Sequence, residues 1–270
     1  RLRGCQFNQP RMRRPGILDV GISYNFRMTH LPMDLLLEGA AQLDMVLTDR
    51  QLDQFTLYYL ELVQWNQRVN LTNITGFEEV QVKHFLDSLT AISALKQFPV
   101  GGSLLDLGTG AGFPGLPLKL VHPGLKLALA ESVGKKVGFL EHMARELALD
   151  ETQVLRGRAE ALAHDPGLRE GFDLVTARGL ARMPLLLEYC LPFCRVGGKI
   201  LAWKHAGTNL NDELVAAERA LELLGGEISQ IYQVELVGLT DGRVVVVVEK
   251  VRSTPENYPR RTGIPAKRPL

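Results

Sequence analysis

The sequence is poor in cysteine. Its three cysteines, Cys5, Cys190 and Cys194, are an odd number and lack the paired spacing of a metal site. A disulfide framework is therefore excluded as the main source of stability, and the scarcity of cysteine fits a reducing cytoplasm. The six histidines show no ligand spacing either, so we expect no metal.

Long apolar runs are also missing. The longest valine run, residues 244–248, has the length of a strand, whereas a membrane-spanning helix needs about 20 apolar residues. Residues 1–30 lack the apolar core of a secretory signal, although their arginines leave a transit peptide as a weaker alternative. We expect no membrane partner, a cytoplasmic location, and an extension over residues 1–32 that is poorly ordered.

Acidic side chains are nearly absent from both ends of the chain. Residues 1–14 contain five basic and no acidic side chains, residues 252–270 contain five basic and one acidic, and the residues between them contain 21 basic and 29 acidic. Basic ends suggest contact with a polyanion through counterion release, with merely solubilising tails as the alternative. The prolines of residues 252–270 predict an extended, stiff strap that presents these basic side chains to a polyanion. Its candidate polyanion-binding residues are Arg252, Arg260, Arg261, Lys267 and Arg268, which become candidate RNA-binding residues if the polyanion is RNA.

One glycine-rich stretch, residues 104–118, is typical of a strand, a tight turn and a helix. Dinucleotide-binding loops have the spacing Gly-x-Gly-x-x-Gly, but here the third glycine comes one position early. An acid two residues before the first glycine would repel phosphate and attract a cation. The stretch therefore favours S-adenosylmethionine, which carries a sulfonium and an ammonium, over a dinucleotide or a turn without a ligand. The candidate donor-binding residues are Asp106, Gly108, Gly110, Gly112 and Phe113.

The spacing of apolar residues predicts an α/β protein. Residues 33–98 form an expected N-terminal helical lobe, and strands then alternate with helices, which indicates a parallel sheet covered on both faces. The sheet ends in an expected hairpin, which favours a Rossmann-like class I methyltransferase fold with seven strands over a dehydrogenase. A methyltransferase domain over 99–251 and a tail over 252–270 complete the expected organisation. The expected helices are 33–47, 49–69, 77–98, 114–121, 134–148, 182–195 and 210–224, and the expected strands are 103–107, 125–130, 152–156, 171–177, 198–203, 227–236 and 243–251.

Polar residues follow the expected strands at their carboxyl ends, where parallel sheets bind ligands. Glu131 follows the second strand and could bond a ribose diol, and Ala159 and Glu160 follow the third and could flank an adenine. Arg178 and Lys204 follow the fourth and fifth strands. Each of these is individually more often an ordinary surface residue, but all of them converge on one edge.

Taken together, these motifs resemble the glucose-inhibited division protein B family, the small-subunit ribosomal RNA methyltransferase G enzymes. The resemblance covers roughly residues 33–270, and the Phe-Pro-Gly extension of the glycine-rich turn and the C-terminal signature are its most specific marks. The motifs that carry it are Asn70-Leu-Thr, His84-Phe-Leu-Asp-Ser-Leu89, Asp106-Leu-Gly-Thr-Gly-Ala-Gly-Phe-Pro-Gly115, Glu131-Ser, Lys135-Lys-Val-Gly-Phe-Leu140, Arg158-Ala-Glu160, Ala177-Arg178 and residues 258–270.

The resemblance implies transfer of a methyl group from S-adenosylmethionine to N7 of a guanine in 16S ribosomal RNA, with S-adenosylhomocysteine as the product. The partner would be free 16S RNA or the small ribosomal subunit. Carried over by position, the donor would contact Gly108, Phe113, Ala159, Glu160 and Arg178. We expect Arg178 and Lys204 to hold the target base or its phosphate, although His205 stands where the family usually has glycine.

Two other functions remain open from the residues. A small-molecule methyltransferase could use the same sheet, and a non-catalytic RNA-binding assembly factor could bind the donor without turnover. The basic tail counts against the first of these. No strongly apolar helix face suggests self-association, so we expect a monomer.

Overall fold

The computed structural model describes residues 31–95, 98–99, 101–236 and 238–270. The expected extension over residues 1–32 lies almost entirely outside these residues. Residues 31–270 form one compact unit.

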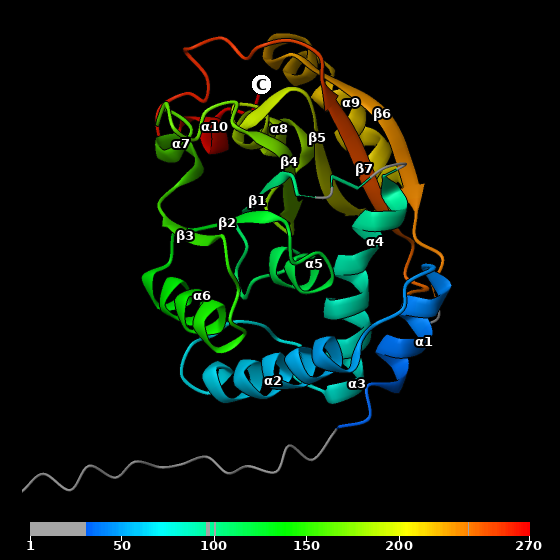
Figure 1. Ribbon diagram of the computed structural model, residues 1–270. Helices are drawn as coiled ribbons and strands as arrows, with labels where there is room; N and C mark the ends of the chain where they lie inside the picture. The colour runs from blue at the N-terminus through cyan, green and yellow to red at the C-terminus, as the bar shows by residue number, and fades with distance from the viewer. Residues whose placement is uncertain (1–30, 96–97, 100, 237) are drawn as a thin grey trace, which may run out of the picture. The chain divides into compact units, whose positions relative to one another are not determined.

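A seven-stranded sheet lies at the centre of this unit (Figure 1), in the strand order β3-β2-β1-β4-β5-β7-β6. The first five strands of the chain pair in parallel, and β7 pairs antiparallel with both β5 and β6. The expected parallel sheet with a terminal hairpin is thereby confirmed. The strands are β1 (Ser103–Leu107), β2 (Lys126–Glu131), β3 (Thr152–Arg156), β4 (Phe172–Arg178), β5 (Cys194–His205), β6 (Gly226–Gln233) and β7 (Arg243–Lys250).

Helices cover both faces of the sheet. The helices before β3 pack on one face, and those after β3 pack on the other (Figure 1). The first group is α1 (Asp34–Gln42), α2 (Asp49–Asn66), α3 (Phe77–Val80), the π-helix η1 (Gln81–Leu86), α4 (Asp87–Ala94), α5 (Gly115–Val121) and α6 (Gly134–Glu146). The second group is α7 (Ala159–Leu162), α8 (Met183–Cys190), α9 (Thr208–Leu224) and α10 (Ile264–Lys267).

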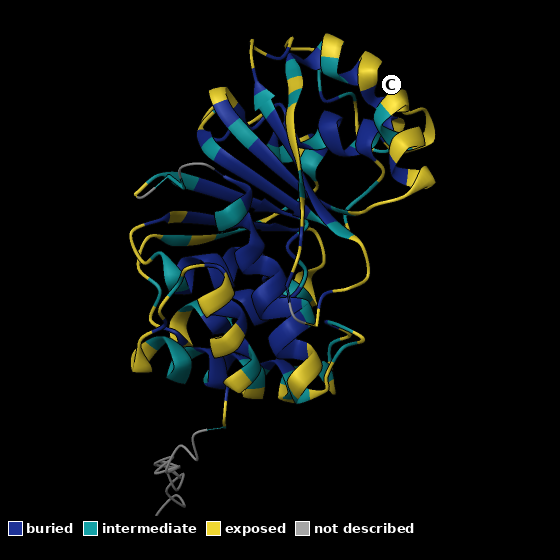
Figure 2. Cartoon of the chain, turned by 90° about the vertical axis from the view of Figure 1, so that its right-hand side faces the viewer, coloured by how far each residue is buried: buried dark blue, intermediate teal, exposed yellow. Residues whose placement is uncertain are grey.

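Alternation along the strands builds two hydrophobic cores. On β1, Leu104 belongs to the core under the first group of helices, and Leu105 and Leu107 belong to the core under the second. Successive side chains of a strand point to opposite faces, so a strand that is apolar throughout is buried on both. Figure 2 shows the resulting pattern, with buried strands between helices whose outward sides are exposed.

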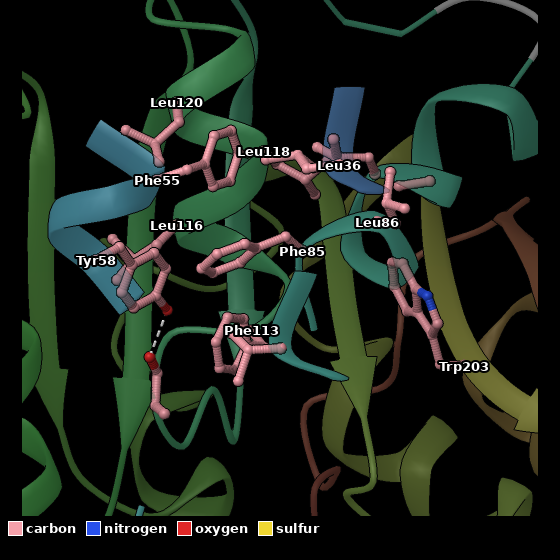
Figure 3. Close-up of a cluster of buried hydrophobic side chains, with 14 of the residues drawn as sticks. Leu36, Phe55, Tyr58, Phe85, Leu86, Phe113, Leu116, Leu118, Leu120 and Trp203 are labelled. Carbon is pink, nitrogen blue, oxygen red and sulfur yellow. Dashed lines mark hydrogen bonds between the residues drawn. The ribbon is translucent and has the colours of Figure 1, made fainter. Parts of the chain in front are cut away.

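The N-terminal helices dock on the glycine-rich turn through aromatic side chains (Figure 3). Helix α2 begins at a capping box made by Thr48 and Gln51, and its buried face carries Phe55 and Tyr58. The ring of Tyr58 stacks on Phe113 with centroids 5.2 Å apart, and its hydroxyl donates to the carbonyl of Ala111 at 2.6 Å. The expected helical lobe is therefore part of the support of the turn.

Several expected boundaries were wrong. Residues 77–98 were expected to be one α-helix, but a π-helical turn interrupts the helix at 81–86 and it ends at Ala94. The first helix ends at Gln42, because the chain turns at Asp44, where φ is +56°. The short helices α7 and α10 were not expected, since four residues are too few to show a helical period.

Within the described ranges, none of the helices has the length and apolarity that crossing a bilayer demands. The same residues contain no group of three or more His, Cys, Asp or Glu side chains arranged to hold a metal ion.

Candidate active site

The glycine-rich turn is held by the buried carboxylate of Asp106. Its Oδ2 accepts hydrogen bonds from the Thr109 hydroxyl at 2.5 Å and from the Gly115 amide at 2.9 Å. Its Oδ1 accepts from the Thr176 hydroxyl of β4 at 3.0 Å. Asp106 has no exposed surface, and this burial raises the pKa of its carboxyl group to about 6. Its hydrogen bonds face inward and support the turn, and direct contact between Asp106 and the donor stays a prediction.

A cavity of about 140 Å³ lies beside the turn, at the carboxyl ends of β1, β2 and β3. We call it the donor cavity. Two carboxylates, a tyrosine hydroxyl and several backbone segments surround it, together with one exposed guanidinium. Its lining residues are Leu107, Gly108, Ala130, Glu131, Ser132, Gly157, Arg158, Ala159, Glu160, Leu180 and Tyr189.

Glu131 is fixed at the start of α6 by backbone donors. Its Oε1 accepts from the amides of Ser132 at 2.7 Å and Val133 at 2.8 Å, and its Oε2 accepts from the amide of Gly110 at 3.1 Å. A helix N-terminus favours a negative group, so the position suits a carboxylate. The backbone amide of Gly110 thus contributes to the cavity indirectly, by holding the carboxylate of Glu131.

The chemistry of the lining fits S-adenosylmethionine. Glu131 and Glu160 give the donor cavity an acidic character that complements a sulfonium and an ammonium and opposes a pyrophosphate. Gly108 lets the backbone approach a ligand, because its φ is +69° and an added Cβ would lie 2.6 Å from a Leu180 methyl carbon.

Four of the predicted donor-binding residues line the donor cavity, namely Gly108, Glu131, Ala159 and Glu160. Gly110, Gly112, Phe113 and Arg178 lie outside its lining, and their contact with the donor stays a prediction. At Gly112 an added Cβ would lie 2.3 Å from a Leu116 methyl carbon and 2.7 Å from the Tyr58 hydroxyl, so this glycine serves packing. Sequence reasoning missed Tyr189, because it lies on α8 and follows no strand.

A second cavity of about 240 Å³ lies at the ends of β4, β5 and β7. We call it the cationic cavity. Gly179 lines it, and the next residue, Leu180, lines the donor cavity, so the two cavities are neighbours. The lining residues of the cationic cavity are Ile74, Lys83, His84, Asp87, Arg178, Gly179, Trp203, Lys204, His205 and Arg243.

Arg178 is the centre of a polar network in this cavity. Its Nη1 donates to Asp87 Oδ2 at 2.8 Å, and its Nη2 lies 2.7 Å from His84 Nδ1. Arg243 also binds Asp87 Oδ2 at 2.8 Å. The guanidinium of Arg178 lies 5.3 Å from the centre of the Phe113 ring, so the network continues into the glycine-rich turn.

His84 is kept neutral in this network. Burial, and then the charge of Arg178, lower the pKa of His84 to about 3. Because a guanidinium can only donate, Nδ1 accepts from Arg178 and the proton is on Nε2, which donates to the Thr72 hydroxyl at 2.8 Å. His84 therefore both bonds the loop that follows α2 and lines the cavity.

Lys204 lines the cationic cavity, but its ammonium is engaged by protein groups. It donates to the carbonyl of Ala181 at 2.7 Å and to Glu213 Oε2 at 2.6 Å. Glu213, on α9, also accepts from the amide of Met183 at 2.9 Å. Lys204 and Glu213 together hold the loop between β4 and α8.

Residues 252–270, the C-terminal segment, are not an extended strap, which corrects the expectation from the prolines. Tyr258 and Leu270 pack against the second core, and Arg260 is paired with the buried carboxylate of Glu188. The side chains of Arg252, Arg261, Lys267 and Arg268 are exposed. Their contact with RNA stays a prediction, whereas Arg260 is occupied by Glu188.

Comparison with known proteins agrees with this geometry. A family model described as GidB, rRNA small subunit methyltransferase G, matches residues 51–238. Ribosomal RNA small subunit methyltransferase G of Roseiflexus sp. (strain RS-1) is 48% identical over 238 residues, which are 88% of this chain and 100% of that protein. The protein of the same name from Dehalococcoides mccartyi (strain CBDB1) is 44% identical over the same shares.

Solved structures support the fold. A mutant of MtNAS in complex with S-adenosylmethionine matches with a TM-score of 0.50 and 15% identity over 82% of this chain and 88% of that chain. A putative transferase from Pyrococcus horikoshii matches with a TM-score of 0.50 and 13% identity over 62% of this chain and 63% of that chain. At these identities the likeness concerns the fold alone. The match over most of its length shows that this chain belongs to the GidB family, the rRNA small subunit methyltransferase G enzymes.

Proposed function

We propose that this chain transfers a methyl group from S-adenosylmethionine to N7 of a guanine in 16S ribosomal RNA. The observation that carries the proposal is the pair of neighbouring cavities, one acidic and one rich in cationic side chains, on the two sides of Gly179 and Leu180. A cationic donor suits the first, and an electron-rich base on a phosphate backbone suits the second. Family membership supports the choice of ribosomal RNA.

The residues of the donor cavity bind and orient the donor. We assign Glu131 to the ribose hydroxyls and Ala159 and Glu160 to the adenine side, in keeping with their positions after β2 and β3. When bound, S-adenosylmethionine supplies an activated methyl group on a sulfonium. Alignment of reacting groups can lower a barrier by roughly 7–11 kcal/mol, so positioning is the main task of this lining.

The residues of the cationic cavity hold the acceptor without removing a proton from it. Guanine N7 has a free lone pair at neutral pH, so attack needs no general base. His84 agrees with this, because its pKa of about 3 keeps it neutral and Nδ1 is occupied by Arg178. We assign Arg178 to contact with the base or its phosphate, and Lys204 to positioning of the loop beside it.

The position of N7 on guanine also limits which RNA structures can be substrates. N7 lies on the major-groove edge, which side chains cannot read in an A-form helix, so the target guanine must be unstacked or in a loop. We infer that the chain acts on free 16S RNA or on the small subunit, and therefore in the cytoplasm. The exposed basic side chains of the C-terminal segment, Arg252, Arg261, Lys267 and Arg268, would contact RNA phosphates.

The test is methyl incorporation from labelled donor into three substrates, namely naked 16S RNA, purified small subunits and a mixture of small-molecule acceptors. We expect label in 16S RNA or in subunits, at a single guanine that becomes sensitive to cleavage at N7-methylguanine. Label in small molecules alone would contradict the proposal, and donor binding without transfer to any substrate would favour an assembly factor.

Arg178→Met provides the matched variant for this assay. It should lower kcat by at least about tenfold, which corresponds to loss of one charge-assisted contact, while S-adenosylhomocysteine affinity changes less. Arg195→Met, which removes an exposed ion pair with Asp173, is the control and should keep full activity.

A further inference from the structure

The C-terminal segment is anchored to α8 by a buried ion pair. The carboxylate of Glu188 has no exposed surface. Arg260 donates to Glu188 Oε1 through Nε at 2.9 Å and to Oε2 through Nη2 at 2.6 Å, and its backbone amide donates to Oε1 at 2.9 Å. A two-point contact of this kind fixes orientation as well as charge.

A second set of contacts holds the beginning of the segment. The guanidinium of Arg169 donates to the carbonyls of Thr254 at 2.9 Å and Tyr258 at 2.9 Å. His164 Nε2 lies 3.0 Å from the carbonyl of Pro259. The backbone that leads to Arg260 is thus tied to the protein at three carbonyl groups.

At Gly263 the segment contacts a residue that lines the donor cavity. The amide of Gly263 donates to Glu160 Oε1 at 3.0 Å, and a φ of +82° at this glycine provides the backbone conformation that the contact uses. Glu160 lines the donor cavity, as does Tyr189, the residue next to Glu188 on α8. The side chain of Glu160 is therefore bonded to the C-terminal segment directly, and Tyr189 directly follows the residue that binds Arg260.

We propose that the C-terminal segment supports the wall of the donor site from behind, in which Gly263 positions Glu160 and Arg260, through Glu188, positions Tyr189. This inference rests on the proposed function, in which the donor cavity binds S-adenosylmethionine. Loss of the segment would lower donor affinity directly, before RNA is involved.

Two adjacent arginines then have different tasks. Arg260 is occupied by Glu188 inside the protein, whereas the side chain of Arg261 is exposed. The two residues carry the same charge and are neighbours in sequence. Their alanine variants therefore form a matched pair, because each removes one guanidinium and only one of them changes the wall of the donor site.

The experiment measures S-adenosylhomocysteine binding by calorimetry and RNA binding by filter retention for Arg260→Ala and Arg261→Ala. We expect Arg260→Ala to raise the Kd for S-adenosylhomocysteine by at least about tenfold, as loss of roughly one well-made contact would, and Arg261→Ala to leave it unchanged. Arg260→Lys keeps the positive charge but cannot make the two-point contact of a guanidinium. Its Kd for S-adenosylhomocysteine should lie between those of the two alanine variants. Equal donor affinity in both alanine variants would overturn the proposal.

A second measurement uses the unaltered protein and so does not depend on whether Arg260→Ala folds. If the segment helps the donor to bind, the donor must stabilise the segment by the same free energy. Hydrogen exchange of amides in residues 258–268 should therefore slow when S-adenosylhomocysteine is added. Unchanged exchange there, with slowed exchange at residues 107–112, would overturn the role of the segment and leave the proposed function intact, whereas absence of any binding would overturn the donor itself.

Discussion

Asp106 is a buried carboxylate whose role depends on hydrogen-bond geometry. Its two oxygens accept from Thr109, Gly115 and Thr176, and burial raises its pKa to about 6 from 3.8. The folded state therefore binds more protons than the unfolded state between about pH 4 and 6, and stability falls as pH rises through this range. Keeping this carboxyl group ionised costs the folded state on the order of 3 kcal/mol. We infer that the turn requires the hydrogen-bond acceptors that the Asp106 side chain provides.

Asp106→Asn tests whether the turn and donor binding depend on the hydrogen-bond acceptors of this side chain or on its negative charge. The amide oxygen can take the place of Oδ2, and the amide nitrogen can donate to the Thr176 hydroxyl, so we expect the turn and donor affinity to be kept. Stability should rise above pH 6 and lose the fall between pH 4 and 6 that Asp106 contributes, as measured by urea unfolding at several pH values. Asp106→Ala should unfold the turn and abolish donor binding, because Gly115 and Thr109 lose their acceptor. A large loss of donor affinity in Asp106→Asn would restore a direct role for the charge.

The stability that His84 contributes depends on pH with the opposite sign to the contribution of Asp106. Its pKa is lowered to about 3 from 6.5, so the unfolded state binds more protons between these values. The stability that it contributes is complete above about pH 6.5 and is lost as pH falls toward 3. Asp106 and His84 therefore oppose each other between pH 4 and 6, and the Asp106→Asn profile should show the slope of His84 more clearly.

At the scale of elements, the loop between β4 and α8 separates the two cavities and is held by α9. Glu213 of α9 accepts from Lys204 and from the amide of Met183, and Lys204 also donates to the carbonyl of Ala181. The loop carries Gly179 and Leu180, one for each cavity. A change in Glu213 should therefore reach both sites without touching either ligand.

A double-mutant cycle of Lys204→Met and Glu213→Gln distinguishes positioning from direct contact with RNA. If Lys204 acts through the loop, each variant should lower kcat by a similar factor of about ten, and the double variant should be no worse than the poorer single variant. Steady-state kinetics with small subunits provide the measurement. If Glu213→Gln instead binds RNA as well as or better than the unaltered chain while Lys204→Met binds it poorly, Lys204 contacts RNA directly.

The π-helical turn η1 is an element that periodicity could not reveal. The motif around His84 and Asp87 has the apolar spacing of an ordinary helix, and this spacing does not distinguish the wider turn at Gln81–Leu86. There His84 and Asp87 reach Arg178 of β4, while Trp203 of β5 donates to the carbonyl of Asp87 at 2.9 Å. π-Helical turns are often found at functional sites, and this one joins the N-terminal helices to the cationic cavity.

For the whole molecule, the exposed apolar side chains are dispersed. Among the described residues, Val46, Val215 and Ile231 lie in the loop after α1, on α9 and on β6 respectively. Large continuous apolar patches are the usual mark of a stable protein interface. That this chain is a monomer stays a prediction.

Light scattering coupled to size exclusion should find a mass near 30.0 kDa, unchanged by S-adenosylhomocysteine. A stable particle of twice this mass would contradict the prediction and would direct attention to the edge strand β6.

The order of strands and helices, the terminal hairpin and the glycine-rich turn were determined by the sequence itself. These features depend on local chemistry, namely apolar runs, turn residues and glycines, and they were confirmed by the topology. Residues after strand ends, such as Glu131 and Glu160, were predictable for the same reason, since parallel strands bring their carboxyl ends to one edge.

Only the tertiary structure decided how charged side chains are used. Asp106 supports the turn, Lys204 holds a loop and Arg260 pairs with Glu188, because each meets a partner that is distant in the chain. Arg243 joins Arg178 through Asp87 for the same reason. A charged residue in a sequence shows only that it needs solvent or a partner; burial and long-range contacts determine which of these it has.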